Sequence, residues 1–306
     1  MNRQDTIHLQ SERSFLRQQL ASLPATAQLT RLSTESRLRG VDKQLAETKV
    51  SAREPARARL TFRGRPVVAS HGIFAEFGTK ATNAFTDVVA KVAAALSGPL
   101  ASMGRIPNRD QSQMLITSTA VGSFGFELEE HCPSELPLGE ESSTEKALEL
   151  ASKLLQSTLG SDDELADSAA GTDPRAVEAV RSFLEILASS DAVCVLECGQ
   201  QVFRFRDVGQ VRQSLERLGQ QNLHEAQQAL EGEFQGVLPK SRTFEFKLAE
   251  SGEVVSGKVG PAITDADAIN NHLHQRTKIS VMTTRVGNGR PRYVLIEEPS
   301  WPAGTP

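Results

Sequence analysis

The feature that most constrains the fold is a β-rich pattern in the C-terminal part of the 306-residue chain. Apolar and polar residues alternate through FQGVLPKSRTFEFKLAESGEVVSGKVG, residues 234–260, and alternation over short runs predicts strands. Asn288-Gly289 is typical of a tight hairpin turn. We expect strands at 229–238, 242–249, 253–260, 277–287 and 290–298, with a helix capped by Thr264 at 264–274.

This order of three strands, a helix and two strands predicts a small five-stranded β-barrel over residues 229–298. A helix after the third strand is typical of an OB-like barrel, and an SH3-like barrel is the alternative. We expect the tail, residues 299–306, to be loose.

The N-terminal residues, 1–57, have helical spacing and predict a basic helical arm. Pro24 ends the first apolar pattern, and a second pattern follows it, so two amphipathic helices in a hairpin are expected. Two short helices leave apolar stripes that need cover, which makes these stripes a candidate protein interface. The residues concerned are Leu16, Leu20, Leu38, Val41 and Leu45.

The middle of the chain, residues 58–228, predicts an α+β body. A ββαββ block comes first, with strands at 59–73, a helix at 80–97 and strands at 113–130. An acidic helical middle follows, in which we expect 160–173 to be a polar loop that can include a short helical turn. A Ser142/Glu145 capping box predicts the start of a helix at 143–159, and Asp173-Pro174 predicts the start of a second helix at 174–187. A hairpin around Gly199 and a helix from Val208 to Leu218 complete the body. The overall class is α+β.

The net charge of −4 conceals a strong asymmetry along the chain. Residues 1–66 carry 13 basic and 6 acidic side chains, whereas residues 131–200 carry 4 basic and 14 acidic ones. Either region could meet an external partner, or the two could meet each other. No apolar run is long enough to cross a membrane, no secretory signal is evident, and three cysteines make no disulfide framework. We therefore expect a cytoplasmic protein.

The motifs for metal or cofactor chemistry are weak. Cys194 and Cys198 share a face of a predicted strand but lie too far apart for one metal, so a core role is expected. His272 and His274 point to different sides of a predicted helix, and the acidic run at 162–167 lacks the glycine of a calcium loop. Gly122-Ser123-Phe124-Gly125 runs into a strand, unlike a phosphate loop. We expect no metal and no cofactor.

A catalytic site would have to be assembled in space. His71 is the most interesting histidine because it precedes a glycine at a strand end. A hydrolase site in the ββαββ block is the lesser alternative, and it would use His71, Asp110, Ser123, Glu127 and His131.

The function that this pattern favours is a non-enzymatic scaffold or accessory subunit that binds a protein partner or a second copy of itself. The alternative is a nucleic-acid-binding protein that uses the basic arm and the barrel. The basic side chains that could contact nucleic acid or an acidic partner are Arg37, Arg39, Lys43, Arg53, Arg57, Arg59, Arg63 and Arg65.

Overall fold

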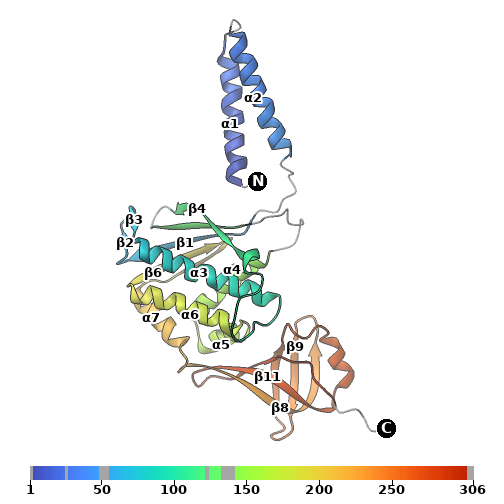
Figure 1. The fold of residues 1–306 in the computed structure, drawn as a ribbon. Helices are drawn as coiled ribbons and strands as arrows, with labels where there is room; N and C mark the ends of the chain where they lie inside the picture. The colour runs from blue at the N-terminus through green and yellow to red at the C-terminus, as the bar shows by residue number, and fades with distance from the viewer. Residues whose placement is uncertain (1–2, 25–26, 48–54, 121–123, 132–141, 302–306) are drawn as a thin grey trace. The chain divides into compact units, whose positions relative to one another are not determined.

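The computed structural model describes residues 3–24, 27–47, 55–120, 124–131 and 142–301 (Figure 1). The described residues form two compact units, one up to Pro55 and the other from Ala56 onward. None of the helices in these ranges combines the length and apolar character needed to cross a membrane. The fold is of the mixed α+β class, as the sequence predicts.

The first unit is a hairpin of two helices, α1 (Arg3–Ser22) and α2 (Gln28–Glu47). Pro24 stands just after α1, where a residue without an amide proton interrupts the helix. Leu9, Leu16 and Val41 are buried between the helices. Ion pairs from α1 to α2 complete the contact, Arg13 with Asp42 at 2.7 Å and Glu12 with Arg37 at 2.6 Å.

The second unit is built on a five-stranded antiparallel sheet of order β4-β5-β1-β6-β7. The central strand β1 turns Ala58, Leu60 and Phe62 towards the core, and its arginines alternate with them on the other face. The hairpin predicted around Gly199 therefore joins the strands of the ββαββ block in one sheet. The strands are β1 (Arg57–Gly64), β4 (Met114–Ala120), β5 (Phe124–Glu130), β6 (Ala192–Cys198) and β7 (Gln201–Arg204).

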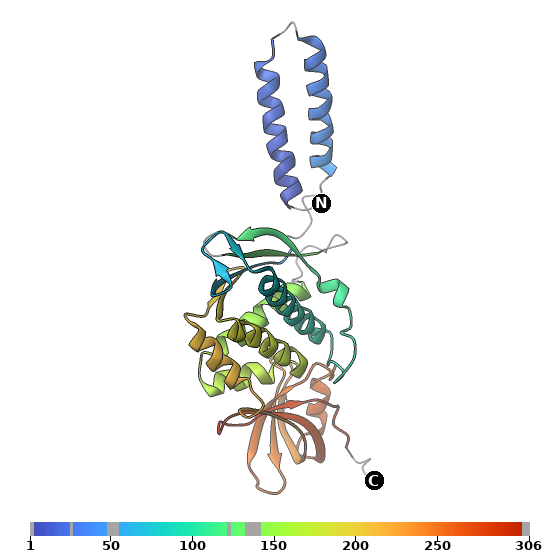
Figure 2. The ribbon, with the colours of Figure 1, turned by 60° about the vertical axis from the view of Figure 1, so that its left-hand side comes forward.

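Helices cover one face of this sheet, as Figure 2 shows. Their apolar stripes meet the sheet in a single core that includes Phe85, Leu148 and Leu184. Local signals start two of them, because Ser142 accepts a hydrogen bond from the Glu145 amide and Asp173 accepts one from the Arg175 amide. The helices are α3 (Ala75–Leu96), α4 (Ser143–Ser157), α6 (Pro174–Ser189) and α7 (Val208–Arg217), and a 3₁₀ turn η1 (Arg109–Ser112) precedes β4.

The structure corrects two local predictions in this unit. The acidic run expected to be a loop with at most a short helical turn forms the nine-residue helix α5 (Asp162–Ala170), which begins with a reciprocal capping box between Ser161 and Glu164. Acidic side chains in its first turn complement the helix dipole. The second predicted strand of the block is instead a small hairpin, β2 (Val67–Val68) and β3 (Gly72–Ile73).

The C-terminal strands close a barrel in the order β10-β12-β11-β8-β9. The first barrel strand, β8, pairs with both the second and the fourth, and the third and fifth strands pair in parallel. This is the OB-type order rather than the SH3-type alternative. The strands are β8 (Leu223–Leu238), β9 (Thr243–Leu248), β10 (Val254–Val259), β11 (Arg276–Val286) and β12 (Arg292–Leu295).

The barrel interior is closed by aromatic side chains. Phe234, Phe244 and Phe246 are buried together, and Trp301 packs against this core. The indole also stacks on His272 with ring centroids 4.2 Å apart, so the predicted loose tail is anchored as far as Trp301. Residues 302–306 lie outside the described part of the chain.

The predicted helix between the third and fourth barrel strands is shorter than expected. It is a 3₁₀ turn, η2 (Asp267–His272), and not an α-helix over 264–274. Asp265 rather than Thr264 accepts hydrogen bonds at its start, from the amides of Asp267 and Ala268.

The barrel is joined to the helical layer through α5. Arg292 of β12 binds both Asp163, at 3.0 Å, and Asp167. The hydrogen bond with Asp167 is the main reason that the pKa of the Arg292 guanidinium is raised, although partial burial opposes it. Leu223 and Val286, from the ends of β8 and β11, are buried in the core of the helical layer. The barrel and the helical layer are therefore packed together within one unit.

We expect Arg292→Ala to lower the free energy of unfolding by about 1–2 kcal/mol, because it removes charge-assisted hydrogen bonds to two carboxylates at once. Urea denaturation measures this change. Lys278→Ala is the matched control, since its pair with Glu231 at 3.4 Å is largely exposed and should contribute about 0.5 kcal/mol or less. Equal losses in the two variants would contradict a special role of the α5 contact.

Candidate functional site

Most of the predicted basic residues are already engaged inside the protein. Arg37 pairs with Glu12, and Arg39 donates from Nε to the Glu35 carbonyl oxygen at 3.4 Å. Lys43 also has a partner. Arg37 and Arg39 interact within the hairpin in addition to carrying charge, and Arg53 lies outside the described residues.

Arg57 and Arg59 lie on the sheet face opposite the helices, among carboxylates from neighbouring strands. Arg57 pairs with Glu129 at 3.1 Å, and Arg59 pairs with Glu197 at 3.5 Å. The Glu129 side chain is only 7% exposed, whereas that of Glu197 is 41% exposed. Arg57 therefore balances a buried charge, whereas the Glu197 partner of Arg59 is partly hydrated.

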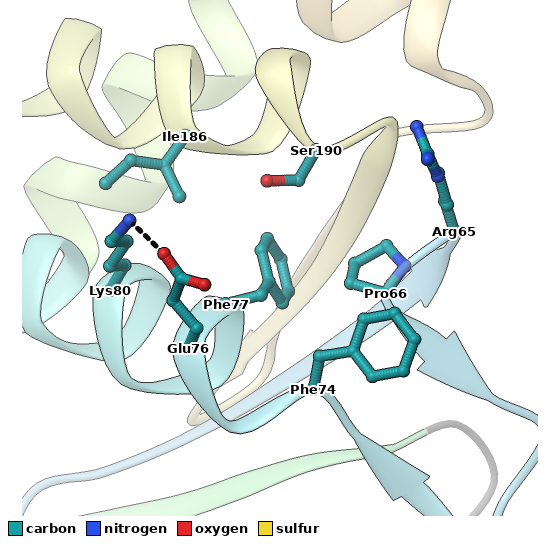
Figure 3. A pocket seen from close by; sticks show the side chains of 8 residues that line it. All are labelled: Arg65, Pro66, Phe74, Glu76, Phe77, Lys80, Ile186 and Ser190. Atoms are coloured by element: carbon teal, nitrogen blue, oxygen red, sulfur yellow. Dashed lines mark hydrogen bonds and ion pairs between the residues drawn. The ribbon is translucent and has the colours of Figure 1, made fainter.

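The remaining two arginines, Arg63 and Arg65, are exposed at the end of β1 and just after it. Arg65 lines a pocket of about 320 Å³ beside the start of α3 (Figure 3). Phe74 and Phe77 form its apolar floor, and Lys80 is neutralised by Glu76 at 2.7 Å. The pocket can offer an aromatic surface and one guanidinium group to a ligand.

The residues of the predicted hydrolase site are spread over different elements. His71 is exposed in the turn of the β2–β3 hairpin, Asp110 is in η1, and Glu127 and His131 belong to or follow β5. Ser123 lies outside the described residues. Among the four that the structure describes, no hydrogen bond or ion pair joins any two.

The soft metal ligands of the sequence are not grouped. Cys194 and Cys198 are buried on the core face of β6, and burial raises the pKa of both thiols, that of Cys198 to about 12. Within the described ranges, no three His, Cys, Asp or Glu side chains are placed to share a metal ion. Cys132 lies outside those ranges.

Most of the aromatic side chains of the barrel that could stack on bases are buried. Three of the four aromatic residues that could stack on bases, Phe234, Phe244 and Phe246, are buried in its core, and Tyr293 is half-buried. OB-type barrels bind ligands with the second and third strands and with the loops after the first and fourth strands. The loop after the fourth strand leads into Arg292, which is held by α5.

The predicted interface residues of the hairpin largely pack inside it. Leu16 and Val41 are buried, and Leu38 and Leu45 pack against them. Leu20 is partly exposed. The exposed apolar side chains are others, which the helical-spacing argument passed over because they fall outside the main stripe. They are Phe15 at 63%, Leu29 at 85% and Leu32 at 59% exposure.

A larger cavity lies where the barrel meets the helical layer, and we call it the junction cavity. Its volume is about 560 Å³. The end of α3, the segment after it, the end of α5 and the outer face of the barrel contribute to its walls. Most of the lining side chains are apolar, and they include Val92, Leu96, Leu100, Leu150, Met282, Val294 and Ile296. The lining residues come from segments between residues 92 and 297, so no local sequence motif could have predicted this cavity.

The junction cavity contains one carboxylate with an unusual environment. Glu225 lies near the start of β8, and its side chain is exposed to solvent because the cavity is open to water. Partial desolvation nevertheless raises the pKa of its carboxyl group, and the negative charge of Asp173 raises it further. Two acidic groups therefore face an apolar space from opposite elements.

The other polar groups of the cavity wall are engaged with the protein. Asp173 accepts hydrogen bonds from the amides of Leu100, at 3.0 Å, and Arg175, at 2.9 Å. The Arg175 guanidinium donates to the carbonyl oxygens of Ala101 and Gly104 at 2.9 and 2.7 Å. Within the described residues, no side chain provides a hydrogen bond or ion pair to the Glu225 carboxylate.

Comparison of the chain with protein-family models, with curated proteins and with solved structures found no match.

We expect Arg57→Ala to lower the free energy of unfolding by about 2 kcal/mol, because the buried Glu129 loses its counter-ion. Arg59→Ala is the control and should lower it by about 1 kcal/mol or less, since Glu197 stays hydrated. Urea denaturation gives both values, and adding Glu129→Gln to Arg57→Ala should restore part of the loss. Unchanged stability together with weaker, salt-dependent nucleic-acid binding would instead favour a binding role for Arg57.

We expect Glu225→Gln to raise the melting temperature at pH 7. The raised pKa means that the folded protein favours the protonated carboxyl, so this stability is present below pH 4.5 and is lost as the pH rises through the folded-state pKa. The gain should shrink as the pH is lowered towards 4.5, which differential scanning fluorimetry can follow. Glu245→Gln, on the outer face of β9, should change the melting temperature at neither pH.

Proposed function

We propose that this chain is a protein-binding accessory subunit that assembles through its helical hairpin, with a second copy of itself as the partner. The observation that carries the proposal is the exposure of large apolar side chains on a hairpin whose own core is very small.

The size of that core is the physical reason for a partner. Each helix has 20 residues, yet among the hairpin side chains that the structure describes only Leu9, Leu16 and Val41 are buried apolar residues. Most helical stability in proteins comes from packing of an apolar face, so a hairpin with so little buried apolar surface gains stability from a partner. The described part of the hairpin contains no cysteine for a disulfide, and we take oligomerisation as the route.

The position of the exposed leucines favours a second copy as the occupant. Leu29 and Leu32 are three residues apart on α2 and share a face, and Leu32 is half a turn around the helix from the buried Val41. A two-fold axis would place this face against the same face of a second hairpin, because an isologous contact needs only one self-complementary patch. The product would be a four-helix bundle.

This proposal and the nucleic-acid alternative respond differently to salt. A contact made by leucines persists as the ionic strength rises, whereas binding to phosphates weakens steeply. Dimerisation through the hairpin also needs no oxidising environment, which is compatible with a cytoplasmic protein.

We expect the double substitution Leu29→Glu with Leu32→Glu to convert a dimer into a monomer, because it places two charges in an apolar contact. Size-exclusion chromatography with multi-angle light scattering gives the mass directly. The matched control, Gln28→Glu with Thr30→Glu, adds the same charge at exposed positions of the same helix and should remain dimeric.

Two outcomes would overturn this proposal. A wild-type chain that is monomeric at every accessible concentration would exclude a second copy as the partner. A dimer that survives the double substitution, with helicity by circular dichroism unchanged, would show that these leucines do not form the contact.

A further inference from the structure

We propose that the junction cavity binds a small organic cation, a molecule with an apolar body and one protonated amine, with Glu225 as the counter-ion. This site belongs to the second unit and is independent of the hairpin contact proposed above.

The size and the walls of the cavity match a small-molecule site. Its volume of about 560 Å³ lies within the range of roughly 300–1,000 Å³ that is typical of such sites. The walls come from both the helical layer and the barrel, and ligand sites occur preferentially at such junctions. Leu96 and Leu100 on one side and Met282 and Ile296 on the other offer apolar surface to the body of a ligand.

The charge of the site selects a cation. Glu225 and Glu297 line the cavity, and Asp173 adds a third carboxylate. Arg175 is the cation among the lining residues, and it is directed at two backbone carbonyl oxygens. The Lys258 ammonium lies beside Gly171 at the wall, and in the described structure neither cation forms an ion pair with these acids. An anionic ligand would meet three negative charges, and a neutral one would leave the Glu225 carboxylate without a partner.

Glu225 has the environment expected of a carboxylate that binds a cation. Desolvation and the nearby Asp173 make its ionised form unfavourable, so the pKa is raised. An ammonium group beside it would reverse this effect, because an opposite charge within a few ångströms favours the ionised carboxylate. Ligand binding and ionisation of Glu225 are therefore coupled.

A pair of fluorescent probes tests the proposal in the full-length protein. One is a dansyl fluorophore carrying a 5-aminopentyl chain, and the other is the same fluorophore with a pentyl chain that lacks the amine. Dansyl emission rises in apolar surroundings, so titration gives a dissociation constant for each. We expect the amine probe to bind on the order of tenfold more tightly at pH 7.5, as a charge-assisted hydrogen bond predicts.

Substitutions locate the binding. Glu225→Gln should remove the advantage of the amine probe and leave the affinity for the pentyl probe unchanged. Ala95→Phe fills part of the cavity without touching a carboxylate and should weaken both probes at least tenfold. Glu245→Gln, the same change on the solvent face of the barrel, should affect neither probe, and the Leu29→Glu with Leu32→Glu variant should bind both like the wild type.

Several results would overturn the proposal. Equal affinity for the two probes would remove the preference for a cation, and binding that persists in Ala95→Phe would place the probes outside the cavity. Absence of binding at millimolar probe with the wild-type protein would exclude a site for cations of this size. None of these results bears on dimerisation, so the two proposals fail separately.

Discussion

The contact between the barrel and helix α5 is the interaction on which the rest of the second unit depends. Arg292 places one guanidinium against two carboxylates of α5, and Leu223 and Val286 carry the barrel ends into the core of the helical layer. Without this contact the barrel would be a separate module, and the ends of β8 and β11 would be exposed to solvent. With it, the outer surface of β8, β11 and β12 becomes one wall of the junction cavity.

The same contact changes what an OB-type barrel can do. The surface that such barrels use for ligands includes the loop between the fourth and fifth strands, and here that loop leads directly to the residue held by α5. The phenylalanines that might have stacked on bases fill the interior instead. The barrel therefore works as a packing partner of the helical layer, and the apolar space arises on its flank rather than on its usual binding face.

The predictable parts of the fold have local causes. Asp173-Pro174 and Ser142 start helices because their side chains and backbone restrictions act within one helical turn. The alternation in residues 234–260 predicts strands because successive side chains of a strand point to opposite faces, one buried and one exposed. Helix α5 was missed although Ser161 and Glu164 form the same capping signal as other helix starts, because its nine residues bury only Leu165, Ala166 and Ala169. The sequence also did not predict the first residues of strand β8, for a different reason. Residues 224–228 are exposed and mostly polar, and their strand conformation comes from backbone pairing with β11.

The site residues show why charge along a chain is a poor guide to charge in space. The arginines at 57 and 59 were candidates for an external partner because they belong to a basic segment, but antiparallel pairing brings carboxylates from residues 129 and 197 beside them. The acidic segment is likewise balanced in part by Arg217 and Arg292, which are remote in sequence. Strand and helix packing therefore brings opposite charges from distant segments together, and their attraction offsets part of the cost of desolvating them. The unbalanced group at the junction cavity, Glu225, belongs to neither segment, and its importance follows from the space that it faces rather than from its neighbours in the sequence.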